Sequence, residues 1–172
     1  MSQGERLRRF RIQRTPGGEL DLRLAQHASE TDEFLVARLL ATVAYHGPGF
    51  EVSSGVCRGD EPALSRRELD GRLVLWIEIG LPKRDRLDRA LRAAEQVVVV
   101  AHKRADVFLR ELEDDPPRRK ERLRVHVLDA ATLTRLGKEL DRDNRWSIDV
   151  EPALLRVRTP KTAHELAFTS AI

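Results

Sequence analysis

Five acidic residues are the strongest candidates for chemistry in this chain. Glu78 stands in an apolar stretch, Asp60 and Glu61 belong to an Asp-Glu-Pro sequence, and Glu30 or Glu33 stands at the start of an apolar helical segment. Carboxylates that converge in space bind Mg²⁺ or Mn²⁺, and such an ion can activate water against a phosphodiester. Asp60 precedes Glu78 by 18 residues, which is enough for a loop and a returning strand to bring the two together. A metal site is therefore one hypothesis for these residues, with Glu78, Asp60 and Glu61 as its main candidate ligands and Glu30 or Glu33 as further ones.

Glu78 is the most informative of these residues because its strand is predicted to be buried on both faces. Residues 72–80 alternate so that one face carries Leu73, Leu75, Ile77 and Ile79, and the other carries Val74, Trp76 and Glu78. Two apolar faces are typical of a central strand. A buried carboxylate must be hydrogen-bonded, paired, protonated or bound to a cation, because burying it bare costs several kcal/mol. Glu78 also falls near the carboxyl end of its strand, where α/β sheets usually bind ligands.

The acidic residues also have explanations that involve no function. They can be surface carboxylates or helix caps, which are common in a chain with 34% charged residues. Glu78 can equally be held in a structural ion pair with a buried arginine such as Arg38. Asp70 is a further acidic candidate, but it precedes the strand of Glu78 and ranks behind Asp60.

The elements that would position these residues follow from hydrophobic periodicity. Residues 7–13 and 19–25 alternate apolar and polar side chains around a Thr-Pro-Gly-Gly turn, which predicts an antiparallel hairpin. Ser29, followed by Asp32 three residues on, predicts the start of a helix. From Phe34 to Tyr45 this helix is apolar nearly all round, so we expect it to be deeply buried.

The rest of the chain alternates strands and helices. We expect strands at 50–56, 72–80, 96–101 and 123–128, helices at about 84–95, 104–113 and 130–141, and short strands near 146–150, 154–158 and 165–169. The order strand, helix, strand over 72–101 predicts a right-handed parallel crossover unit. The predicted fold class is therefore α/β, with a compact mixed-sheet domain, an N-terminal hairpin and C-terminal short strands.

Composition limits the classes of function. A length of 172 residues predicts one domain spanning 1–172. The net charge is only +3 although arginine outnumbers lysine 26 to 5, so a phosphate-bearing partner such as nucleic acid is permitted but not required. No apolar run is long enough to span a bilayer, so no membrane association is expected. A single cysteine, Cys57, and the lack of a visible signal sequence fit a reducing cytoplasm.

The order of several motifs resembles the YaeQ family of bacterial proteins. The similarity spans essentially the whole chain, and its most specific part is a Trp-Ile-Glu-x-Gly-x-Pro tract together with the Asp-Glu-Pro sequence. The matching segments are Leu24–Thr31, Arg38–Leu40, Gly55–Cys57, Asp60–Pro62 and Leu75–Pro82, with a looser match at Arg86, Ala90, residues 96–101 and Arg104–Ala105.

This resemblance implies a variant of the PD-(D/E)XK nuclease core. In that superfamily an Asp, and an Asp or Glu two residues before a Lys, bind a divalent metal, and a Glu from the preceding helix often joins them. Carried over by position, Glu78 corresponds to the second acid, Asp60 to the first and Glu30 to the helix acid. Gly80 stands where the motif has Lys, and Lys83 is the nearest replacement.

Two hypotheses of function follow. In the first, Glu78, Asp60, Glu30 and Lys83 form a catalytic site that cleaves nucleic acid with Mg²⁺ or Mn²⁺. In the second, the chain kept a nuclease fold without catalysis and binds nucleic acid or a protein partner. The second hypothesis predicts a neutralising arginine beside Glu78 in place of an open metal position.

Overall fold

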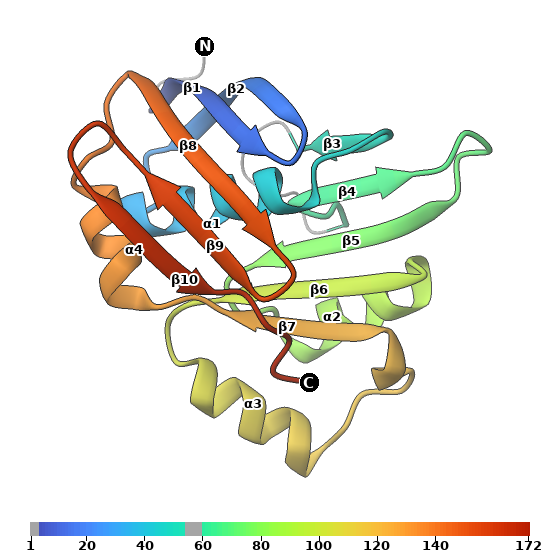
Figure 1. Cartoon of the computed structure of the whole chain (residues 1–172). Coiled ribbons are helices and arrows are strands. Elements are labelled where there is room, and N and C mark those ends of the chain that lie inside the picture. The colour runs from blue at the N-terminus through green and yellow to red at the C-terminus, as the bar shows by residue number, and fades with distance from the viewer. Residues whose placement is uncertain (1–3, 54–59) are drawn as a thin grey trace. The chain divides into compact units, whose positions relative to one another are not determined.

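The computed structural model describes residues 4–53 and 60–172. The chain divides into two compact units, Met1–Ala44 with Leu128–Thr169 and Tyr45–Val127 with Ser170–Ile172. Each unit contains one five-stranded sheet (Figure 1). The α/β class is thereby confirmed, but with two mixed sheets where the sequence indicated one. The prediction of a single domain over 1–172, and of a nuclease core within it, stays a prediction.

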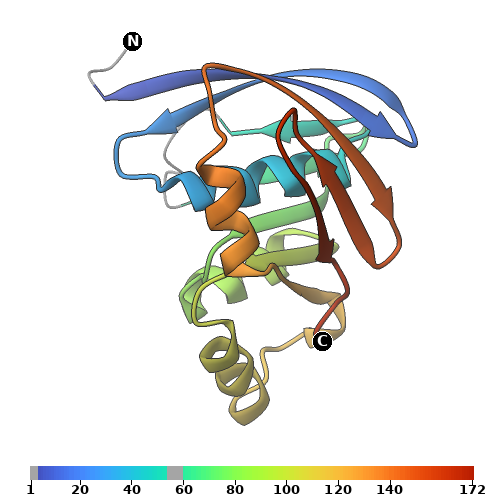
Figure 2. The same cartoon turned by 60° about the vertical axis from the view of Figure 1, so that its left-hand side comes forward.

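The first unit is built on a long N-terminal hairpin. Strand β1 (Glu5–Thr15) pairs antiparallel with β2 (Gly18–His27), as predicted but longer at both ends (Figure 2). On its other side β1 pairs in parallel with β8 (Asp143–Glu151). The predicted C-terminal strands are also present, as β8, β9 (Leu154–Arg158) and β10 (Ala163–Ala167). The resulting order is β10-β9-β8-β1-β2.

The inner face of this sheet and two helices share a core. Phe10 and Ile12 of β1 are fully buried, and the ring of Phe10 meets that of Trp146 edge-on, with centroids 6.0 Å apart. Helix α1 (Asp32–Tyr45) is buried over nine consecutive residues, 35–43, which confirms the predicted buried helix. Helix α4 (Ala130–Gly137) reaches the start of α1, where Thr134 donates a hydrogen bond to Glu33.

The start of α1 differs from the prediction. The helix begins at Asp32, and Thr31 caps it by accepting a hydrogen bond from the backbone N–H of Phe34 at 3.2 Å. The predicted cap, Ser29, instead bonds the ring of His27 through its hydroxyl at 2.7 Å. The reason is that two hydroxyl residues precede this helix, and the sequence alone does not decide which of them adopts the cap geometry.

The second unit contains the predicted crossover. Strand β5 (Leu73–Ile79), helix α2 (Arg84–Ala93) and strand β6 (Gln96–Ala101) form a parallel unit. Helix α3 (Ala105–Asp114) then leads to β7 (Leu123–Val127), which is parallel to β6. The sheet order is β3-β4-β5-β6-β7.

Two strands at the edge of this sheet were less well predicted. The sequence did not indicate β4 (Leu64–Arg67), because its four residues include only one large apolar side chain. Strand β3 (Phe50–Val52) is the beginning of the predicted strand at 50–56. The end of that predicted strand and Cys57 lie outside the described residues.

Helices α2 and α3 cover one face of the second sheet. Trp76 of β5 belongs to a buried cluster with residues of both helices and of β6 and β7. Its side chain is 3% exposed, so Trp76 is a core residue, as expected. Glu78 follows Trp76 by two residues and therefore projects from the same face, toward α2.

None of the helices formed by the described residues is long and apolar enough to cross a membrane.

Candidate functional site

The Glu78 carboxylate is buried and is held by contacts within the second unit. The residue is 6% exposed. Its Oε1 atom accepts one hydrogen bond from Trp76 Nε1 at 2.5 Å and another from Arg86 Nε at 2.9 Å. The prediction that this carboxylate must be bonded or paired is therefore confirmed. Its arginine partner is Arg86, not Arg38.

Arg86 connects Glu78 to the Asp-Glu-Pro sequence. It lies in the first turn of α2, and its Nη2 atom donates to the backbone carbonyl of Glu61 at 2.6 Å. The same guanidinium lies 5.9 Å from the ring centroid of Trp76, within the range of a cation–π contact. The Arg86 guanidinium thus links helix α2 to strand β5 and to the Asp-Glu-Pro sequence.

Asp60 and Glu61 contact α2, and their role as metal ligands together with Glu78 stays a prediction. The Asp60 carboxylate pairs with Arg89 Nη1, one turn after Arg86, and is 88% exposed. Glu61 contributes its backbone carbonyl to Arg86, and its side chain is exposed. Within residues 4–53 and 60–172, no three His, Cys, Asp or Glu side chains lie close enough to hold a metal ion together.

The two residues after β5 that bear on the predicted catalytic lysine are Gly80 and Lys83. Gly80, the residue predicted to stand in place of the motif's lysine, has φ +87°, and its N–H donates to the carbonyl of Val100 at 2.9 Å. Lys83 is exposed and stands immediately before α2 without capping it through its side chain. A catalytic role for Lys83 stays a prediction.

Asp70 lies at the wrong end of β5 to join Glu78. It is in the turn before the strand, where its carboxylate binds the side chain and backbone N–H of Arg72. Since a strand rises about 3.3 Å per residue, Asp70 and Glu78 are separated by roughly 17 Å or more along β5. They cannot share an ion.

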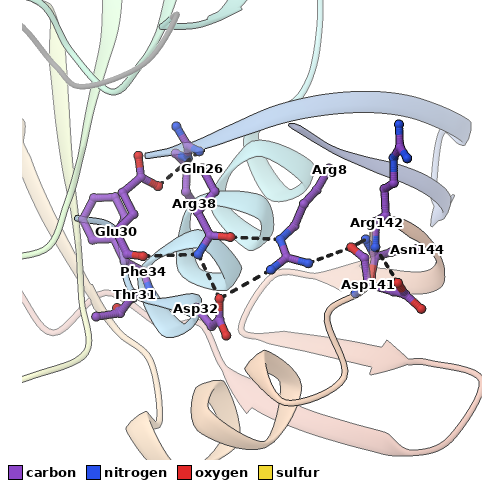
Figure 3. Close-up of polar contacts among 10 residues, drawn as sticks. All are labelled: Arg8, Gln26, Glu30, Thr31, Asp32, Phe34, Arg38, Asp141, Arg142 and Asn144. Carbon is purple, nitrogen blue, oxygen red and sulfur yellow. Dashed lines mark hydrogen bonds and ion pairs between the residues drawn. The ribbon is translucent and has the colours of Figure 1, made fainter. Parts of the chain in front are cut away.

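Glu30 belongs to the first unit, where it pairs with Arg38 (Figure 3). Its Oε2 atom lies 3.3 Å from Arg38 Nη2, and the two side chains are 11% and 4% exposed. Burial raises the pKa of the Glu30 carboxyl above its ordinary value, against the opposing effect of Arg38. Its role as the helix acid of a metal site stays a prediction.

A second buried arginine, Arg8, lies beside this pair and was missed from the sequence (Figure 3). Its Nε donates to Gln26 Oε1 at 2.9 Å and its Nη1 to the carbonyl of Asp141 at 2.8 Å. Gln26 in turn donates to Asp32 at 2.8 Å. Strand alternation could have identified this residue, because Arg8 shares the inward face of β1 with Phe10 and Ile12.

Pockets border this polar network on two sides. One of about 450 Å³ is lined by Glu30, Gln26 and His27 together with residues 4–6. Another, of about 730 Å³, is lined by Arg8, Asp32 and the segment that follows α4. Because Arg8 is already bonded to Gln26 and Asp141, the network is a structural support for the start of α1.

Several known proteins are similar to this chain. The protein named "Uncharacterized protein YaeQ" from Escherichia coli K12 is 28% identical over 153 residues, which cover 88% of this chain and 84% of that protein. A protein with the same name from Salmonella typhi is 28% identical over 150 residues, with 87% and 83% covered.

Two crystal structures have the same fold. The YaeQ protein from Xanthomonas axonopodis pv. citri superimposes with a TM-score of 0.88 at 27% identity, covering 97% of this chain and 98% of that one. The YaeQ protein from Pseudomonas syringae gives a TM-score of 0.85 at 23% identity, with 99% and 98% covered. The sequence model of the family described as YaeQ protein matches residues 9–168. The chain therefore belongs to the YaeQ family.

Proposed function

We propose that this protein binds nucleic acid without cleaving it. The observation that supports the absence of cleavage is the contact between Arg86 and Glu78, because the guanidinium and the Trp76 N–H both donate to Oε1 of the carboxylate that a metal ion would need. A buried carboxylate compensated by an arginine and an indole N–H is already stable without a cation. This is the arrangement that the hypothesis of a non-catalytic nuclease fold predicts.

Two further features support the absence of hydrolysis. Gly80 stands in place of the motif's lysine and has φ +87°, a backbone conformation that disfavours any side chain. A lysine at this position would therefore strain the backbone. Asp60 is paired with Arg89, so its carboxylate is also already compensated by an arginine. Without a lysine or an equivalent cation, an ion at this place would have to activate water unaided.

The test is a binding and cleavage experiment on the wild-type protein and Glu78→Gln, prepared in parallel. Labelled single-stranded and duplex DNA and RNA are mixed with each protein in EDTA and in Mn²⁺. Binding is read by fluorescence anisotropy and cleavage on a gel. We expect binding in EDTA that weakens as salt rises, and intact substrate in Mn²⁺.

Two outcomes would overturn the proposal. Cleavage that requires Mn²⁺ and disappears in Glu78→Gln would establish a nuclease, and the matched preparation excludes a contaminating enzyme. Failure of the wild-type protein to bind any of the four nucleic acids would remove nucleic acid as the partner.

Metal-dependent phosphodiester hydrolysis is the second candidate function. It is favoured by the position of Arg86, whose single guanidinium bonds both the Glu78 carboxylate and the backbone of Glu61, so the Asp-Glu-Pro sequence lies beside Glu78. Isothermal titration of Mn²⁺ separates the two candidates. Under the nuclease hypothesis the wild-type protein binds Mn²⁺ and Glu78→Ala does not. Under our proposal neither protein binds it.

A further inference from the structure

A short segment of the second unit carries several basic residues close together. Residues 118–124, the basic segment, contain five basic residues and one acidic residue, which gives a charge of +4. The whole chain carries +3, so the remainder of the chain sums to −1. The basic residues of the segment are Arg118, Arg119, Lys120, Arg122 and Arg124.

These side chains are accessible and are not neutralised by neighbours. Four of the five are exposed and Arg122 is half-buried. In the part of the chain that the structure describes, none of them forms a hydrogen bond or an ion pair through its side chain. Three arginines of the first sheet, in contrast, form ion pairs: Arg9 pairs with Asp21, Arg156 with Glu151 and Glu165, and Arg158 with Asp149.

The backbone of the basic segment is held in place from both sides. Upstream, Arg84 of α2 donates hydrogen bonds to the carbonyls of Asp115 and Pro116, at 2.6 and 3.2 Å, and Pro117 is buried. Downstream, Leu123 enters β7 and belongs to the core. The segment is therefore ordered before any ligand arrives, which lowers the entropic cost of binding.

Arg119 adopts a backbone conformation that arginine disfavours. Its φ is +66°, in the left-handed region, directly before a short 3₁₀ turn, Lys120–Arg122. Glycine or asparagine would occupy this place at a lower cost, since a left-handed residue with a larger side chain costs roughly 1–2 kcal/mol. Arg104 is the other arginine of the described residues with a positive φ, so this conformation describes the backbone of the basic segment and does not by itself assign a role to the side chain.

We propose that the basic segment is the surface that contacts the phosphate backbone of a nucleic-acid duplex. This inference rests on the proposed function and adds the place and the form of the ligand. Arginine guanidinium groups bind phosphate oxygens through two parallel hydrogen bonds. A duplex is favoured over a single strand because single-strand binding relies on exposed aromatic side chains, and the exposed large apolar residues of the described chain include none.

The test compares two triple variants that remove the same charge. Arg118→Gln/Arg119→Gln/Lys120→Gln removes three cations from the basic segment. Arg9→Gln/Arg156→Gln/Arg158→Gln removes three that are paired on the first sheet. Affinity for labelled DNA and RNA duplexes is measured by anisotropy over a range of salt concentrations, after circular dichroism has established that both variants are folded.

We expect the basic-segment variant to lose duplex affinity by on the order of tenfold or more. The slope of its salt dependence should fall by about 0.9 for each DNA phosphate that the removed cations neutralise. The paired-arginine variant should stay within about twofold of wild type, because its cations are already neutralised. A third variant, Arg118→Lys/Arg119→Lys, keeps the charge and should keep most of the salt dependence, which separates loss of charge from local disorder.

The outcomes also separate this inference from the proposed function. If the wild-type protein binds duplexes and both triple variants lose the same affinity, net charge rather than this segment is responsible, and the inference is wrong while the proposed function stands. If neither triple variant changes binding, the duplex binds to another part of the protein. The inference is then wrong, and the proposed function stands. If the wild-type protein binds no nucleic acid, both are wrong.

Discussion

Arg86 and Glu78 are eight residues apart in the sequence, and the Nε of one donates to the Oε1 of the other at 2.9 Å. Their side chains are 20% and 8% exposed, so the ion pair is largely removed from water. In such a place each charge depends on the other, because an isolated buried charge costs several kcal/mol. The contact between strand β5 and helix α2 is therefore sensitive to substitution of either residue.

Removing the cation of this pair should destabilise the protein strongly. Arg86→Met retains much of the aliphatic stem but leaves the Glu78 carboxylate with the single N–H of Trp76, and we expect a loss of about 3–5 kcal/mol in the free energy of unfolding. Glu78→Gln keeps an oxygen that accepts from both donors and should cost less. Urea-induced unfolding measures both values.

The double variant Glu78→Gln/Arg86→Met is the control for this prediction. Its loss should be smaller than the sum of the two single losses, since removing both charges leaves none uncompensated. A cost below about 1 kcal/mol for Arg86→Met alone is the size expected of an exposed ion pair, and it would contradict the assignment.

Glu30 should make the free energy of unfolding depend on pH. Burial raises the pKa of its carboxyl above the ordinary value of 4.5, so the folded protein holds this proton more tightly than the unfolded chain. The stabilisation is then fully present below pH 4.5 and is lost as the pH rises through the folded pKa. Relative to Glu30→Gln, the wild-type protein should gain stability on acidification.

This prediction is measured as the difference in unfolding free energy between wild type and Glu30→Gln at several pH values. The difference isolates Glu30 because all other titrating groups are common to both proteins. A difference that moves in favour of Glu30→Gln as the pH falls would show that the Arg38 charge outweighs burial at this carboxyl, and a constant difference would show that the two effects cancel; either result contradicts the prediction.

The sequence was sufficient to identify Glu78 but not its partner. Alternation along 72–80 predicts a buried acid, because strand periodicity is a local property. Finding Arg86 requires the rotation and register of α2 on the sheet, which depend on how Leu87, Ala90 and Leu91 pack against β6. Gly80 is a similar case: the sequence shows a missing lysine, and only the backbone shows a positive φ.

The division into two sheets was also beyond the sequence. Periodicity locates strands but does not say which strands pair across long separations. Strand β1 pairs in parallel with β8, more than a hundred residues later, in a register that sets Phe10 opposite Asn144. The register of this pairing depends on how the side chains of the whole inner face pack together, including Phe10 against Trp146, and neither strand determines it alone.

Tyr45 should titrate at a higher pH than a free tyrosine. Its hydroxyl lies 2.7 Å from Nε2 of the buried His126, and burial raises the pKa of the phenol above its ordinary value of 10.0 although Arg124 and Arg66 oppose this effect. The chain contains one tyrosine, so an ultraviolet titration of the phenol reports this residue alone. Stability should fall as the pH rises through the folded pKa, and a midpoint at or below 10.0 would contradict the prediction.

Gly49 is required for the close approach of β3 to β4. Its φ is +73°, and a Cβ atom there would lie 2.2 Å from the carbonyl oxygen of Arg67, whose N–H is itself bonded to the Gly49 carbonyl at 3.1 Å. Gly49→Ala should therefore reduce the free energy of unfolding by more than the backbone strain alone, roughly 3 kcal/mol or more.

Gly71→Ala is a matched control, because Gly71 has φ +87° and no atom lies within 4 Å of the position that a methyl group would take there. It should cost only about 1–2 kcal/mol. Chemical unfolding of the two variants measures the difference between their free energies of unfolding. Equal losses would mean that β3 shifts away from β4 at no further energetic cost.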